Sequence, residues 1–163
     1  MARAQITAEP NQSLVLITRE FDAPLDSVVR AHLDPDLVAQ WWGPRGVEIT
    51  IERYEVRDGG RWRVVHRDAD GEFAFYGVFH GTPSGDGIVQ TFQYDGAPPS
   101  LEARSFEERE GRTTVRTTSA FLSVEARDAM VEAGMASGVE EGYEQLDELL
   151  GRLGGPSLKT RHD

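Results

Sequence analysis

Three polar residues, His66, Glu102 and Arg104, lie in predicted β-strands at positions two or four residues away from apolar residues. Side chains two residues apart lie on one face of a strand, so Glu102 and Arg104 share a face with Phe106, and His66 shares one with Trp62. If those faces point inward, an imidazole, a carboxylate and a guanidinium line one side of an internal space. We predict that this polar side holds a carboxylate or a similar group of an otherwise apolar ligand.

The opposite register of the Glu102 strand is also open. It would turn Leu101, Ala103 and Ser105 inward and leave Glu102 and Arg104 in water. Charge on strands is ordinarily exposed, because burying an unpaired charge is costly. Glu102 and Arg104 side chains directed to bulk solvent would therefore exclude the polar site.

The usual catalytic patterns are missing from the chain. There is no Gly-x-Ser-x-Gly elbow, His-Glu-x-x-His helix, phosphate-binding glycine loop or dinucleotide fingerprint. Cysteine is absent, and the single lysine, Lys159, lies near the C-terminus, which argues against thiolate and Schiff-base chemistry. A base formed by His66, with Asp68 as its orienting partner, is the main catalytic alternative. We assign no catalytic residue, cofactor or metal, since metal-ligand spacing is absent from the four histidines, His32, His66, His80 and His162.

Composition restricts the partners. The formal net charge of −11 disfavours nucleic acid and anionic membrane surfaces, and no apolar run reaches the roughly 20 residues that cross a bilayer. The first ten residues lack the apolar centre of a signal peptide, so we expect a cytoplasmic protein. A length of 163 residues fits one domain, expected over residues 13–153, with flexible ends at 1–12 and 154–163.

The order of predicted elements is one strand, two short helices, six strands and one long helix. The first strand is Leu14–Phe21, and two Asp and Pro pairs, Asp22 with Pro24 and Asp34 with Pro35, begin the two short helices. Short turn-rich dividers separate the later strands, so consecutive strands should pair antiparallel. These strands are expected near Val47–Val56, Arg61–Arg67, Phe73–His80, Ile88–Tyr94, Leu101–Glu110 and Arg112–Phe121.

The final segment changes to helical periodicity. Apolar residues recur every three or four positions from Val131 to Leu153, with Ser123 as the expected N-cap and Gly154 as the stop. This predicts a single amphipathic helix of about eight turns. The helix is the natural cover for a seven-stranded sheet, and a curved sheet would leave a hollow where small residues such as glycine face it.

Several motifs together carry a resemblance to a known family. The chain resembles the START-like superfamily and, within it, the proteins named after the activator of heat-shock-protein-90 ATPase, over roughly Leu14 to Leu153. Two positions depart from the common pattern, the loop 82–87 and Tyr143, where a Trp is usual. The matching motifs are Phe21-Asp22-Ala23-Pro24, Asp34-Pro35, Trp41-Trp42-Gly43-Pro44, Gly59-Gly60-Arg61-Trp62, Asp70-Gly71, Gly77, Phe106-Glu107-Glu108, Thr113 and Glu141-Gly142-Tyr143-Glu144-Gln145-Leu146.

The resemblance implies an α+β helix-grip fold (START/Bet v-like), in which a seven-stranded curved antiparallel sheet wraps a long C-terminal helix around a hydrophobic cavity. Two short helices follow the first strand. Relatives often dimerise, so a homodimer is an open expectation. We expect the cavity to be lined by Trp42, Trp62, His66, Phe73, Phe75, Phe79, Phe92, Glu102, Arg104, Phe106, Met135 and Tyr143.

Three functions follow from this pattern. The first is binding of a small apolar or amphipathic ligand, because aromatic side chains should wall the cavity. The second is an enzyme of the cyclase, dehydratase or hydrolase kind acting on an aromatic or lipid-like substrate through His66, Arg104 or Tyr143. The third is a module that contacts a chaperone ATPase, which the family name suggests.

Overall fold

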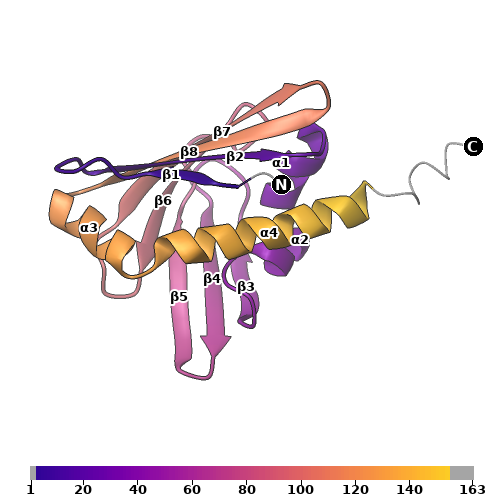
Figure 1. Ribbon diagram of the computed structural model, residues 1–163. Helices are drawn as coiled ribbons and strands as arrows, with labels where there is room; N and C mark the ends of the chain where they lie inside the picture. Colours follow the sequence, from indigo (N-terminus) through magenta and orange to yellow (C-terminus); the bar gives the residue numbers. More distant parts are fainter. Residues whose placement is uncertain (1–2, 155–163) are drawn as a thin grey trace, which may run out of the picture.

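One antiparallel sheet of eight strands organises the molecule (Figure 1). In this computed structural model, which describes residues 3–154, the strand order is β1-β2-β8-β7-β6-β5-β4-β3. Strands β3 to β8 pair in chain order, which confirms the predicted meander, and β8 then joins β2. The strands are β1 Gln5–Thr7, β2 Leu14–Phe21, β3 Glu48–Tyr54, β4 Arg61–Asp68, β5 Gly71–Val78, β6 Ile88–Tyr94, β7 Ser100–Arg109 and β8 Arg112–Phe121.

The sheet has eight strands where the sequence predicted seven. The additional strand, β1, comes from the segment expected to be a loose end, and it pairs with β2 through Gln5 opposite Thr18 and Thr7 opposite Leu16. Ile6 packs against the main hydrophobic core, which anchors the strand. A three-residue edge strand carries too few residues for alternation to reveal it.

Two short helices, α1 (Leu25–Leu33) and α2 (Pro35–Trp41), follow β2 as predicted. Asp34 caps α2, since its carboxylate accepts a hydrogen bond from the Asp36 amide at 3.0 Å. The predicted cap of α1 by Asp22 is wrong. Pro24 occupies the N-cap position without a side-chain hydrogen bond, so this helix starts by its proline geometry alone.

The long C-terminal helix is in fact two helices, α3 (Val124–Glu132) and α4 (Met135–Leu153). Gly134 has φ 95°, in the left-handed region that favours glycine, and it separates them. Ser123 caps α3 as predicted, and Gly154 is the C-cap of α4. α3 is held to the sheet by Arg127, which is buried and donates to the Leu14 carbonyl at 3.0 Å. The predicted flexible tail beyond Gly154 lies outside the described residues.

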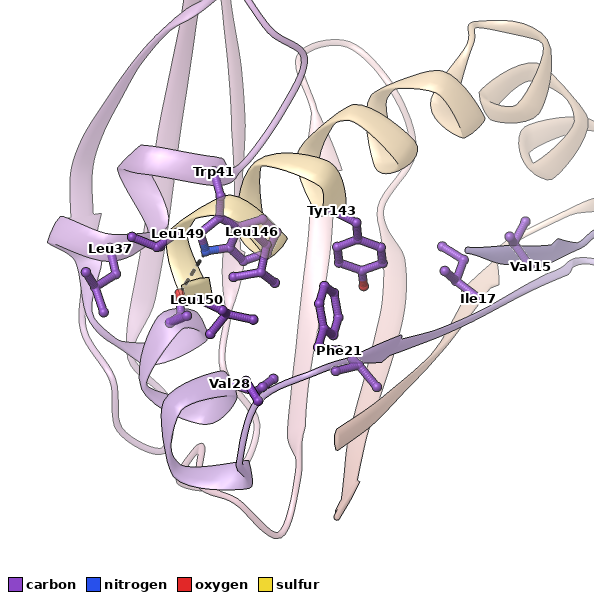
Figure 2. Packing of buried hydrophobic residues seen from close by; sticks show 13 residues of the cluster. Val15, Ile17, Phe21, Val28, Leu37, Trp41, Tyr143, Leu146, Leu149 and Leu150 are labelled. Atoms are coloured by element: carbon purple, nitrogen blue, oxygen red, sulfur yellow. Dashed lines mark hydrogen bonds between the residues drawn. The ribbon is translucent and has the colours of Figure 1, made fainter. Parts of the chain in front are cut away.

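The second half of α4 packs tightly on the sheet and the short helices (Figure 2). Tyr143 meets the Phe21 ring edge-on at a centroid distance of 5.2 Å. Trp41 lies in the same cluster, and its indole N–H donates to the Ala31 carbonyl at 2.9 Å. The close approach of α4 to the end of α2 requires Gly142, because a Cβ there would lie 3.3 Å from the backbone N of Gly43.

A second, smaller core lies on the other half of the sheet. It consists of Trp62, Val64, Phe79 and Ile88, all buried, and comes from β4, β6 and the end of β5. The molecule therefore has two packed regions under one curved sheet. No helix within residues 3–154 is long and apolar enough to span a membrane.

Candidate ligand-binding pocket

An internal pocket of about 430 Å³ lies beneath the sheet on the side covered by α3 and α4. The helices contribute few bulky groups to it, because Ala133, Gly134, Gly138 and Gly142 face the space. A Cβ added to Gly138 would meet no atom within 4 Å. The first half of α4 therefore leaves open the volume that its second half fills.

Aromatic rings form one wall of the pocket. Trp42 lies at its centre, with ring centroids 5.1 Å from His66 and 5.2 Å from Phe75. Phe75 in turn lies 5.6 Å from Phe92 and 5.2 Å from Tyr94. These rings come from the end of α2 and from β4, β5 and β6, so the antiparallel pairing of three strands assembles the wall.

The Trp-Trp-Gly-Pro turn sets the position of Trp42. Gly43 has φ 97°, and a Cβ there would lie 2.7 Å from the Cε1 atom of His66. Glycine is therefore required both by backbone conformation and by space. The turn brings the indole of Trp42 over the His66 and Phe75 rings, which is how the end of a helix joins the strand wall.

A second wall of the pocket is polar and is built on β7 and β8. Glu102 and Arg104 line the pocket, whereas Leu101, Ala103 and Ser105 are exposed, so the alternative register of this strand is wrong. Glu102 accepts hydrogen bonds from the Gln90 amide at 3.0 Å and the Ser119 hydroxyl at 3.3 Å.

Side chains of the neighbouring strand β8 contact Arg104, the cation of this wall. Arg104 donates through Nε to the Thr117 hydroxyl oxygen at 3.2 Å. Thr117 stands directly opposite Arg104 in the β7–β8 pairing, and Ser119 stands opposite Glu102. Both hydroxyl residues are buried, so the two charged side chains rest on polar groups of β8 and not on apolar core.

His66 is a neutral aromatic element of the pocket. Burial lowers its pKa from 6.5 to about 4, against a weaker opposing effect of the Asp68 charge. Its Nε2 atom is buried without a hydrogen-bond partner among the described residues. Asp68 instead accepts from the Asp70 amide at 2.8 Å in the β4–β5 turn. The predicted pairing of His66 with Asp68 as base and orienter is therefore not formed here.

A much smaller recess of about 30 Å³ adjoins the polar wall. His32, Tyr54 and Trp62 line it, and Arg104 lines both this recess and the main pocket. His32 donates from Nδ1 to the Val28 carbonyl at 2.7 Å, which leaves Nε2 as the bare acceptor. Burial first and the Arg104 charge second lower the His32 pKa to about 3, so this ring is also neutral.

Nine of the twelve residues expected in the cavity line the main pocket. Trp62 and Phe79 belong to the second core instead, and Phe106 packs against both cores, with its ring 5.2 Å from His32. The nine are Trp42, His66, Phe73, Phe75, Phe92, Glu102, Arg104, Met135 and Tyr143.

Sequence reasoning missed several residues of the lining. Thr117, Ser119 and Phe121 alternate on β8. The alternation of β8 was visible, but the side chains it places opposite Arg104 and Glu102 depend on the strand register. The glycines expected at the hollow, Gly134, Gly138 and Gly142, also line the pocket, and the other missed lining residues are Ile17, Trp41, Gly43, Pro44, Ser100, Met130, Ala133 and Val139.

Comparison with known proteins assigns the family. The family described as "Activator of Hsp90 ATPase homolog 1-like protein" matches residues 22–151, most of the chain. The protein belongs to this family. The match confirms the sequence resemblance, and the sheet and C-terminal helix confirm the helix-grip fold. No curated protein matches the chain.

Solved structures of bacterial proteins share the fold. A protein from Rhodobacter sphaeroides is 25% identical, with a TM-score of 0.84 over 92% of this chain and 99% of that one. The solution structure of a protein from Arthrobacter aurescens is also 25% identical, with a TM-score of 0.83 over 91% of each chain. Protein Ms6760 from Mycobacterium smegmatis is 22% identical, with a TM-score of 0.82 over 90% of this chain and 95% of that one. Nearly the whole domain is thus common to these proteins.

Proposed function

We propose that this protein binds a small, largely apolar or amphipathic molecule in the pocket between the sheet and α4. The observation that carries this proposal is the pocket of about 430 Å³, which is lined by an aromatic wall and by a polar wall on β7 and β8. Ligand sites of proteins are typically of about 300–1,000 Å³ and combine apolar walls with a few fixed polar groups. A planar apolar body can lie against Trp42, Phe75 and Phe92, while its polar substituent meets β7 and β8.

A large side chain at position 138 tests this proposal, because it should fill the pocket and prevent a ligand from binding. Gly138 lines the pocket, and a Cβ there meets open space, so Gly138→Phe should fill the site without colliding with the backbone. Gly151, on the same helix, also has open space around a Cβ but does not line the pocket, which makes Gly151→Phe the matched control. A neutral probe, 2-naphthylacetamide, is titrated into each protein, and binding is measured by calorimetry and by quenching of tryptophan emission.

We expect Gly138→Phe to weaken probe binding by at least about tenfold, since much of the buried apolar contact is lost. Gly151→Phe should bind like the parent protein. Native mass spectrometry of the purified parent protein, in which a retained small molecule should be absent from Gly138→Phe, gives an independent measure. Equal probe binding by all three proteins would place the site elsewhere and defeat the proposal.

A further inference from the structure

The two charged side chains of the pocket differ in how much hydrogen-bonding capacity remains. Both oxygens of Glu102 already accept hydrogen bonds, one from Gln90 and one from Ser119. Within the described part of the chain, Arg104 uses only its Nε donor, toward Thr117. A guanidinium has five N–H donors, so most of the Arg104 donors are free for another partner. The hydrogen-bonding groups that remain free on the polar wall are therefore donors of the Arg104 cation.

No carboxylate within the described residues forms an ion pair with Arg104. No Asp or Glu oxygen in residues 3–154 lies within 4.0 Å of its guanidinium nitrogens, although the side chain is half-buried. Among the described residues it is also the only lysine or arginine that lines the pocket, and His32, which lines the adjoining recess together with Arg104, is neutral at pH 7. A partly buried cation that no carboxylate contacts directly is costly, so a ligand anion would gain by forming that contact.

Water in the adjoining recess can offset only part of this cost. The recess of about 30 Å³ has room for roughly one or two water molecules. It also contains the unpartnered Nε2 atom of His32, which accepts a hydrogen bond and cannot compensate a cation with charge. The main pocket, which Arg104 also lines, has the room for a larger polar group.

We propose, on the basis of the ligand-binding function above, that the ligand is an organic anion whose carboxylate or similar head group binds Arg104. Its apolar body lies against the aromatic wall around Trp42. The preference for an anion is local, because the protein as a whole carries a formal net charge of −11 and repels anions at long range. Arg104 thus sets the sign of the charge that the pocket accepts.

Three probes with one apolar body test the sign of this preference. They are 2-naphthylacetate, 2-naphthylacetamide and 2-(2-naphthyl)ethylammonium, each titrated by calorimetry at pH 7 into the full chain. A charge-assisted hydrogen bond in a partly buried site should make the anion bind about ten- to a hundredfold more tightly than the amide. The ammonium probe should bind more weakly than the amide.

Two substitutions test whether the Arg104 side chain causes the preference for the anionic probe. Arg104→Gln should reduce the affinity for the anion to about the affinity for the amide. Arg116→Gln makes the same change of net charge on β8, at an exposed residue paired with Glu107, and should keep the anion preference. If Arg104→Gln fails to fold, judged by circular dichroism, the comparison of the three probes on the parent protein still decides.

The outcomes separate this inference from the function on which it rests. Equal binding of all three probes, or preference for the ammonium probe, would overturn the anion assignment and leave the pocket as a ligand site. An anion preference that survives Arg104→Gln would also overturn it. Failure of every probe to bind would count against both proposals together.

Discussion

The two halves of α4 face the same sheet but do different things. From Tyr143 to Leu150 the helix presents large side chains that fill the space above β2 and the short helices (Figure 2). From Met135 to Gly142 it presents glycines, Met and Val, and the pocket lies there. The helix is continuous across the two halves, and the small side chains of its first half leave space where the large ones of its second half fill it.

The largest expected effect distinguishes the two halves by stability. Leu146 is fully buried in the packed half, and Leu146→Ala should lower the free energy of unfolding by about 2–5 kcal/mol. Met135 is only partly buried at the pocket, so Met135→Ala should cost clearly less. Urea unfolding followed by circular dichroism measures both. Equal costs would mean that the pocket half is packed as tightly as the other.

The next effect is a loss of folding stability at acid pH, and it tests the burial of His66 in the pocket wall. His66 has a pKa lowered to about 4, so the unfolded chain takes up its proton near pH 6.5 before the native protein does. Stability should therefore be lost as the pH falls from about 6.5 to 4, by about 2 kcal/mol after allowance for solvent near the pocket.

The ring of His66 can be followed directly. Its Cε1 proton should titrate by NMR with a midpoint near pH 4, and His66→Leu should remove part of the acid sensitivity. His32, with a pKa near 3, acts in the same direction and accounts for much of the remainder. A midpoint near 6.5 would show that water reaches the His66 ring freely and that the wall is open.

A smaller effect is expected at the boundary between the halves. A Cβ on Gly142 would lie 3.3 Å from both the Gly43 nitrogen and the Trp41 carbonyl oxygen. These are backbone atoms, which cannot rotate away as a side chain can, so Gly142→Ala should destabilise the protein by about 1–3 kcal/mol. Thermal unfolding checks the sign. A gain in stability would show that α2 and α4 can separate to admit the methyl group.

Alternation along the strands carried most of the fold prediction. The bounds of β6 and β8 match the sequence expectation, and the turn residues between strands gave the meander. The break at Gly134 could not be foreseen, because the apolar spacing continues from Val131 to Met135 across it. At the break Gly134 has a positive φ, and α3 is attached to β2 by the hydrogen bond from Arg127 to the Leu14 carbonyl.

The site was harder to predict than the fold. Alternation along a strand predicts the side of the sheet on which a side chain lies, but not whether that side chain is buried in the core or lines a pocket. Phe75 and Phe79 were both expected to line the cavity, yet Phe75 lines the pocket and Phe79 is fully buried in the second core. Which one meets open space depends on the covering layer, and that layer comes from distant segments. The side chains of Arg104 and Glu102, in contrast, face the pocket because their strand is covered on one side only.

The smallest expected effect is also the one that most sharpens the comparison, because it reverses sign along a single helix. Gly138 and Gly142 lie one turn apart on α4, but a Cβ on Gly138 meets nothing within 4 Å. Gly138→Ala should therefore stabilise the protein by about 0.5–1 kcal/mol, since alanine costs less backbone entropy in a helix. The same substitution at Gly142 destabilises, so thermal unfolding of the two variants reports the local space directly. A loss of stability in Gly138→Ala would mean that the pocket closes onto α4 in solution, and the volume available to a ligand would then be much smaller than the structure shows.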